Sequence, residues 1–134
     1  MNSLQVIFVN ICPILKSIKN NLLIVEDNSF VGKCITDAAN EISSIGDIHV
    51  IESLQGAISL FEDTIFDLVI LDLKLPDGHG IELLKILKEK QIETKVFVFS
   101  VSTELKTFCL KYGALAFFDK AKDFDKLIEA ITNV

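Results

Sequence analysis

The sequence contains no arginine, no tryptophan and no apolar run long enough to cross a bilayer, and each absence limits function. Its 13 basic residues are all lysines, so neither an arginine finger nor a bidentate arginine clamp on phosphate can form within the chain. Together with 19 acidic residues they give a net charge of −6, which argues against the basic surface of a nucleic-acid-binding module. We therefore expect no direct contact with nucleic acid.

Cysteine is also scarce: Cys12, Cys34 and Cys109 are odd in number and form no CxxC pair. This spacing indicates neither a disulfide framework nor a zinc knuckle, and it favours a reducing, cytoplasmic compartment. We expect Cys34 and Cys109 to be small core residues on helices.

The N-terminal residues 1–15 are uncharged and largely apolar, but a membrane-spanning helix needs about 20 such residues. Lys16 and Lys19 end the run too early, and the basic region and cleavage site of a signal peptide are absent. We expect no membrane insertion, and we treat residues 1–20 as an N-terminal extension of unknown role. Residues 21–134 then form one domain.

From residue 21 onward, short apolar runs alternate with segments of helical period. The predicted strands are 22–25, 48–51, 67–71, 95–99 and 115–118. An amphipathic helix is predicted after each strand. This alternation indicates an α/β protein, a (βα)₅ doubly wound five-stranded parallel sheet, for which we expect the strand order 2-1-3-4-5.

Local signals predict several helix ends and inner faces. Asp27 or Asn28 can cap the first helix, and Ser53, Thr103 and Asp123 can cap the second, fourth and fifth. Gly113 is expected to end the fourth helix. The residues expected to face inward are Phe30, Val31, Cys34, Ile35, Ala38, Ala39 and Ile42 on the first helix, and Leu105, Phe108, Cys109 and Tyr112 on the fourth.

Polar residues follow four of the five predicted strands: Glu26 and Asp27 the first, Asp72 the third, Ser100 the fourth and Lys120 the fifth. The carboxyl ends of parallel strands meet at one edge, where ligands bind beside the reversal of strand order. Three carboxylates gathered there would repel one another, so either their pKa values rise or a cation lies among them. Hard oxygen ligands of this kind suit Mg²⁺. Ser100 and Lys120 could hold phosphoryl oxygens, with Asp72 as the nucleophile. Each residue alone is uninformative, and the joint arrangement carries the prediction.

These motifs resemble the receiver domain of two-component response regulators, over about residues 21–134. LLIVEDN resembles the first strand with its acidic pair, LVILDLKLPDGHG the phosphoacceptor strand and loop, VFVFS the strand with the switch hydroxyl, and GALAFFDK the last strand with its lysine. The resemblance implies a flavodoxin-like receiver fold. It also implies phosphorelay signalling, in which Asp72 accepts a phosphoryl group from a sensor histidine kinase or a histidine phosphotransfer protein.

The same resemblance implies a ligand set and a switch. Mg²⁺ would be bound by Asp27, Asp72 and the main-chain carbonyl of Lys74, and Glu26 would assist, often through water. Ser100 and Lys120 would hold the phosphoryl oxygens. Ser100 would then move toward phosphorylated Asp72, and Phe117, at the switch aromatic position, would rotate inward. These movements would change the face of the fourth helix, fifth strand and fifth helix. Simple core packing is the alternative for Phe117.

The sequence departs from the family pattern next to two of these residues. Ala121 follows Lys120, where many receivers have proline, and Val101 follows Ser100, where a small residue is common. The bulk of Val101 could narrow access to the phosphoryl group and slow its hydrolysis. Neither departure removes a group that phosphorylation needs.

Three other functions compete with this interpretation. The alternative is a non-phosphorylated receiver-like interaction module, against which the intact acidic, hydroxyl and lysine set argues. A phosphatase of the haloacid-dehalogenase type would need DxDx[TV], whereas Leu73 and Lys74 follow Asp72. A flavodoxin-like cofactor binder would need a phosphate loop rich in serine and threonine after the first strand. The sequence has no such loop there, and its lack of tryptophan also argues against this function.

We expect a signalling domain and not an enzyme, catalysing only its own phosphorylation and dephosphorylation. It would stand alone, because the sequence ends directly after the last predicted helix, unless it is a fragment of a longer protein. Its output would be contact with an unknown downstream protein or onward phosphotransfer, and a homodimer is left open.

Overall fold

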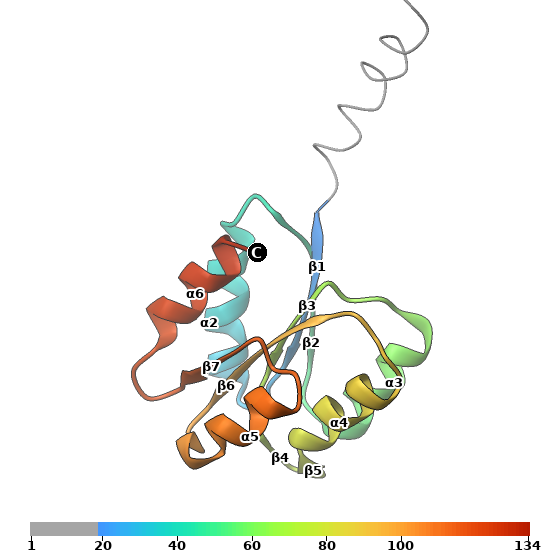
Figure 1. Ribbon diagram of the computed structural model, residues 1–134. Helices are drawn as coiled ribbons and strands as arrows, with labels where there is room; N and C mark the ends of the chain where they lie inside the picture. Colours follow the sequence, from blue (N-terminus) through green and yellow to red (C-terminus); the bar gives the residue numbers. More distant parts are fainter. Residues whose placement is uncertain (1–18) are drawn as a thin grey trace, which may run out of the picture.

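The computed structural model describes residues 19–134, which fold into a five-stranded parallel sheet with helices on both faces (Figure 1). Its strands are β1 (Asn20–Val25), β2 (Ile45–Ile51), β3 (Leu68–Leu71), β6 (Lys95–Ser100) and β7 (Ala116–Asp119). They lie in the order β2-β1-β3-β6-β7, which is the predicted order 2-1-3-4-5 counted along the sheet strands. The fold prediction is confirmed. Residues 1–18 of the expected extension lie outside the described residues.

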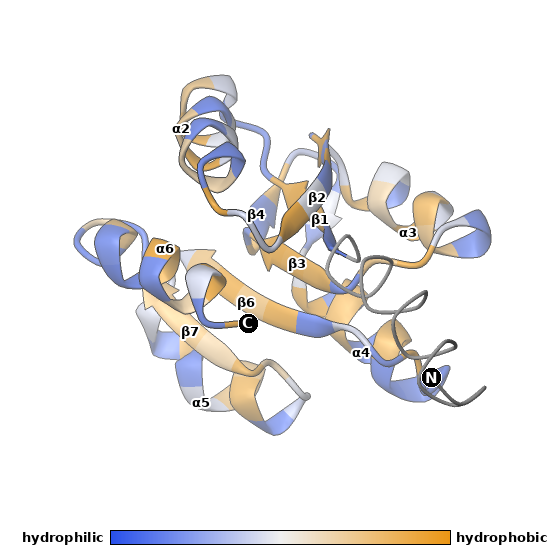
Figure 2. Ribbon diagram, turned by 90° about the horizontal axis from the view of Figure 1, so that it is seen from above, coloured by the Kyte–Doolittle hydropathy of each residue, from blue (hydrophilic) through white to orange (hydrophobic). Residues whose placement is uncertain are grey.

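The helices divide between the two faces of the sheet. One face is covered by α2 (Ser29–Asn40) and α6 (Phe124–Thr132). The other is covered by α3 (Leu54–Asp63), α4 (Ile81–Glu89) and the short α5 (Lys106–Lys111), which follows a 3₁₀ turn, η1 (Thr103–Leu105). In Figure 2 the apolar colouring of β3 and β6 runs between these two layers.

The central strands bury both of their faces, which explains why they read as continuous apolar runs in the sequence. Alternate residues of β1 point to opposite sides: Leu22 and Ile24 contact the layer of α2 and α6, and Leu23 and Val25 contact the layer of α3, α4 and α5. All four are fully buried. The sheet is therefore packed from both sides.

Three of the predicted helix ends are confirmed. Asn28 caps α2, because its side chain accepts a hydrogen bond from the N–H of Val31 at 3.1 Å. Ser53 caps α3 by accepting from the N–H of Gly56 at 3.0 Å. Gly113 follows α5 with φ of +99°, a left-handed conformation that favours glycine.

Two other predicted caps are wrong in detail. Thr103 is the first residue of η1 and caps no helix, since the chain turns directly from β6 into the 3₁₀ turn, where Leu105 N–H donates to the carbonyl of Ser102. Asp123 stands at the N-cap position of α6, but its carboxylate accepts from the N–H of Asp119 and from no helix N–H.

The predicted inner faces are right for most positions and wrong for two phenylalanines. Phe30 is 73% exposed, because the buried stripe of α2 runs through Gly32, Ile35 and Ala39. Phe30 precedes Gly32 by two residues, about 200° around the helix. Phe108 is 38% exposed and stacks on Tyr112, with ring centroids 4.6 Å apart.

Both described cysteines are free thiols on helices, but only Cys109, buried on α5, is the core residue that was predicted. Cys34 is half-buried on α2 and lines a cavity between α2 and α6. Within residues 19–134, none of the helices combines the length and the apolar character that crossing a bilayer requires.

Candidate functional site

The residues predicted from four strand ends meet at the carboxyl edge of the sheet. Backbone hydrogen bonds extend the strand pairing just past the strand ends and place these residues. The N–H of Asp72 donates to the carbonyl of Val25 at 3.0 Å, and the N–H of Lys120 donates to the carbonyl of Ser100 at 3.0 Å. The N–H of Glu26 likewise donates to the carbonyl of Ile51 at 3.0 Å. The position of each functional side chain is thus set by sheet register.

Three carboxylates form a compact acidic cluster at this edge. One carboxylate oxygen each from Glu26, Asp27 and Asp72 lies within 4.8 Å of the others. Glu26 and Asp72 are buried, at 2% and 5% exposure, whereas Asp27 is open to solvent. An incomplete set of hard oxygen donors with one solvent-facing side fits Mg²⁺, which retains water ligands. The predicted convergence of the three carboxylates is confirmed.

Lys120 lies against this cluster and makes two ion pairs. Its Nζ is 2.6 Å from Glu26 Oε1 and 2.9 Å from Asp72 Oδ2. Its ammonium also lies 6.0 Å from the ring centroid of Phe99, which is buried beneath it. A lysine in hydrogen-bonding reach of Asp72 can hold oxygens of a group attached there.

The pKa values of Glu26 and Lys120 respond to this arrangement. Burial raises the pKa of Glu26 above its usual value, and the nearby Asp72 adds to the effect, although bonds from Lys120 and the Asn28 N–H oppose it. Burial acts to lower the pKa of Lys120, but the hydrogen bonds to Glu26 and Asp72 outweigh it and the pKa is raised. Lys120 therefore stays a cation at neutral pH.

Ser100 and Phe117 lie on one side of the sheet. Val98 pairs with Phe117 in the β6–β7 register, and Phe117 packs, half-buried, against the layer of α3, α4 and α5. Ser100 is two residues beyond Val98 on β6, so its side chain points to the same face. It is fully buried, and its Oγ accepts from the N–H of Ser102 at 3.1 Å.

The loop after Asp72 is more ordered than its turn-like sequence indicates. Lys74, predicted as a carbonyl ligand, begins a two-residue strand, β4 (Lys74–Leu75), which pairs antiparallel with β5 (Gly78–His79). The loop closes on itself through a bond of 2.8 Å from the N–H of Gly80 to the carbonyl of Leu73.

Asp77 is a residue of this loop that sequence reasoning did not assign to the site's framework. Its two carboxylate oxygens accept from the N–H groups of Leu54 at 2.8 Å and Gln55 at 2.9 Å, at the start of α3. These bonds lower the pKa of Asp77. Because the partners lie more than 20 residues away, no local sequence pattern reveals the contact.

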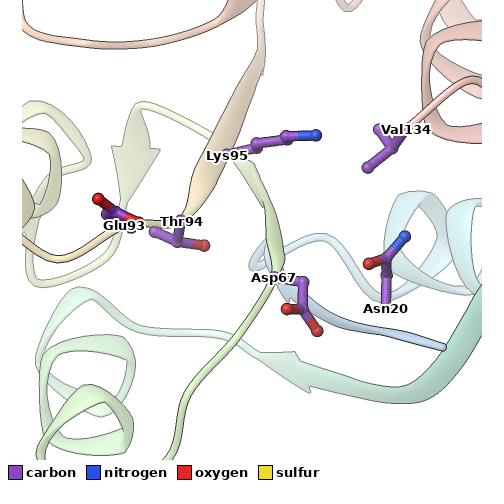
Figure 3. Close-up of a pocket in the computed structure, with 6 residues that line it drawn as sticks. All are labelled: Asn20, Asp67, Glu93, Thr94, Lys95 and Val134. Atoms are coloured by element: carbon purple, nitrogen blue, oxygen red, sulfur yellow. The ribbon is translucent and has the colours of Figure 1, made fainter. Parts of the chain in front are cut away.

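One hollow adjoins the site, and another lies at the opposite edge of the sheet. A cavity of about 240 Å³ lies beside Lys120 between α2 and α6, and it is lined mainly by Phe30, Val31, Cys34, Phe99 and Phe124. A larger hollow of about 370 Å³ lies at the amino edge of the sheet, and Figure 3 shows the residues around it: Asn20, Asp67, Glu93, Thr94, Lys95 and Val134. The larger hollow contains none of the predicted site residues.

Residues 22–132 match the response regulator receiver domain family, and the chain belongs to that family. It is therefore a receiver domain of two-component signalling. Among relatives, it is 30% identical over 115 residues to the transcriptional regulatory protein MalR of Bacillus subtilis (strain 168), covering 84% of this chain and 49% of that protein. It is 33% identical over 115 residues to the nitrate/nitrite response regulator protein NarL of Escherichia coli (strain K12), covering 82% of this chain and 52% of NarL. The chain thus spans about half the length of these curated relatives.

Solved structures agree with this assignment. The receiver domain of the Francisella response regulator 1452 superposes with a TM-score of 0.77 at 29% identity, covering 86% of this chain and 95% of that one. A CheY-like response regulator receiver domain protein from Methanospirillum hungatei JF-1 gives a TM-score of 0.76 at 24% identity, covering 86% and 92%. The second likeness shows the fold alone.

Proposed function

We propose that this receiver domain accepts a phosphoryl group on Asp72, from a histidine kinase or a histidine phosphotransfer protein, in a reaction that requires Mg²⁺. The observation that supports it most directly is the acidic cluster of Glu26, Asp27 and Asp72, with the ammonium of Lys120 2.9 Å from Asp72 Oδ2. Family membership makes a phosphohistidine the donor to expect.

In the proposed transfer, a carboxylate oxygen of Asp72 forms a bond to phosphorus as the P–N bond of the donor breaks. The imidazole nitrogen keeps the electron pair of the broken bond, and the product is an acyl phosphate on Asp72. Glu26, Asp27, Asp72 and the carbonyl of Lys74 would hold the metal, which supplies positive charge to the phosphoryl oxygens. Lys120 supplies a second positive charge, and the Ser100 hydroxyl donates once it turns from the Ser102 N–H.

The proposed output is a changed protein surface. A phosphoryl group on Asp72 adds about −1.5 to −2 charges and three acceptor oxygens. Ser100 and Phe117 share one face of the sheet, so movement of Ser100 toward the phosphoryl group would open space beside Phe117. We propose that this biases the surface of α5, β7 and α6 between two states, which an unidentified downstream protein distinguishes.

The chain then acts as a phosphoacceptor and not as an enzyme with a separate substrate. A cytoplasmic location accompanies this proposal, because the free thiols of Cys34 and Cys109 suit a reducing compartment.

Mass spectrometry after incubation with Mg²⁺ and acetyl phosphate tests the proposal. The wild-type protein should gain one phosphoryl group, and Asp72→Asn should gain none. The matched control is Asp67→Asn, which makes the same change just before β3 at the other edge of the sheet and should be phosphorylated normally. An unmodified wild type, or a gain that persists in Asp72→Asn, would contradict the proposal and favour a non-phosphorylated interaction module.

A further inference from the structure

A hydrogen-bonded turn surrounds Lys120 and begins one residue before it. At the end of β7, Asp119 Oδ1 accepts from the N–H of Ala121 at 2.9 Å. The N–H of Asp119 donates to Asp123 Oδ2 at 3.0 Å, and the N–H of Asp123 donates back to the carbonyl oxygen of Asp119 at 2.8 Å. Asp119 takes part in all three bonds, and Lys120 lies inside the turn they close.

This turn fixes the Lys120 backbone on its C-terminal side, and the sheet fixes it on the other. The N–H of Lys120 donates to the carbonyl of Ser100 at 3.0 Å, which continues the β6–β7 pairing. The carbonyl of Asp119 also accepts from the N–H of Lys122 at 3.1 Å. The direction in which the Lys120 side chain leaves the main chain is thus determined by its neighbours.

The two aspartates act here as acceptors of backbone N–H groups. The bond from the Asp119 N–H is the largest cause of the lowered pKa of Asp123. The bond to Ala121 depends on that residue being other than proline, since proline has no N–H to donate. Among residues 19–134, the carboxylates grouped closely enough to hold a metal are Glu26, Asp27 and Asp72, so Asp119 stands outside that group.

We propose that Asp119 is a positioning residue for Lys120: with Asp123, it closes the turn that directs the ammonium onto Asp72. Lysine has a long flexible side chain, and holding its ammonium at one place costs conformational entropy. A backbone fixed on both sides removes part of that cost, and displacements of about 1 Å in a reacting group can lower rates by up to about 10²-fold. The readout of this inference rests on the proposed phosphorylation of Asp72.

The test compares rates of phosphorylation by acetyl phosphate at saturating Mg²⁺. Asp119→Leu removes the acceptor and should slow the reaction about tenfold. Asp119→Asn keeps an acceptor oxygen in the same place and should stay within about twofold of wild type. As a matched control, Asp125→Leu removes the same charge from an exposed position in the first turn of α6 and should leave the rate unchanged.

A double-mutant cycle separates positioning from general damage. If Asp119 acts through Lys120, Asp119→Leu should cause no further loss in a Lys120→Gln background. Mg²⁺ affinity, measured by calorimetry, should not weaken in Asp119→Leu, because the metal ligands lie on other loops. Asp123→Ala opens the turn from its other end and provides a second variant if Asp119→Leu folds poorly.

The outcomes distinguish this inference from the proposed function. An equal loss in both backgrounds, or an Asp119→Asn variant as slow as Asp119→Leu, overturns the positioning role while leaving phosphorylation intact. A wild-type protein that accepts no phosphoryl group overturns the proposed function, and the positioning role with it. The inference is supported if Asp119→Leu slows phosphorylation only in the protein that retains Lys120, and if Asp119→Asn keeps the wild-type rate.

Discussion

Lys120 lies closer to Glu26 than to Asp72, with its Nζ 2.6 Å from Glu26 Oε1 and 2.9 Å from Asp72 Oδ2. The second oxygen of Glu26 accepts from the N–H of Asn28 at 3.2 Å, so both oxygens of this buried carboxylate are engaged. Asp27 is the exposed member of the cluster. The lysine is therefore the internal counter-ion of two of the carboxylates that we propose bind Mg²⁺.

This relationship predicts that removing the Lys120 charge strengthens Mg²⁺ binding. A divalent cation placed among the carboxylates would be repelled by the ammonium and would compete with it for Glu26 and Asp72. Lys120→Gln should lower the Mg²⁺ dissociation constant about fivefold in calorimetric titration, even as it slows phosphorylation. Lys95→Gln is the control, since it removes one charge at the opposite edge of the sheet and should change the constant little. Weaker binding in Lys120→Gln would show that the lysine does not compete.

Val101 should determine how long a phosphoryl group persists on Asp72. This side chain is 53% exposed and directly follows the buried Ser100 at the carboxyl edge. If its bulk restricts the approach of water, Val101→Ala should shorten the lifetime of the acyl phosphate by about threefold to tenfold. The lifetime is measured as loss of the phosphorylated mass after the donor is removed, with the exposed Leu115→Ala as control. An unchanged lifetime would count against the idea.

The sequence predicted the sheet and the site together because both follow from strand ends. Continuous apolar strands show where the sheet lies, and the polar residue after each strand must then lie at its carboxyl edge, as Asp72 and Lys120 do. Glu26 and Ser100 were found by the same reasoning. No knowledge of side-chain packing was needed for this step.

Contacts that depend on packing between distant segments were not predicted. The bond from Leu54 to Asp77 spans 23 residues, and the loop residues that form it read only as a turn. Phe30 looked apolar and inward, but α2 turns Gly32, Ile35 and Ala39 toward the sheet, and Phe30 lies about 200° around the helix from Gly32. Periodicity along one segment shows neither result, because each depends on which distant segment packs against it.

Asp77 should make stability depend on pH in acid. Its pKa is lowered in the folded protein by bonds from the N–H groups of Gln55 and Leu54. A lowered pKa means that its contribution is present above the ordinary aspartate value of 3.8 and is lost as the pH falls through the folded value. Asp77→Asn should therefore lower the urea midpoint at pH 7 and make much less difference at pH 3. Asp47→Asn, at an exposed position on β2, is the control. A difference that persists undiminished at pH 3 would exclude the carboxylate as the cause.

A side chain at Gly80 should destabilise the protein, although the backbone conformation of Gly80 would allow one. Its φ of −57° suits any residue, but an added Cβ would collide with the carbonyl oxygen of Asp72 and lie 3.1 Å from the Cα of Leu73. Because these are backbone atoms, no rotamer change can relieve the contact, and Gly80→Ala should lower the free energy of unfolding by about 1–3 kcal/mol. Gly32→Ala is the matched control with the opposite sign. It lies inside α2 with its nearest contact at an ordinary 3.5 Å, so the variant should gain about 0.5–1 kcal/mol. Urea denaturation measures the free energy of unfolding of both variants. A Gly80→Ala protein as stable as wild type would show that the loop after Asp72 can shift freely.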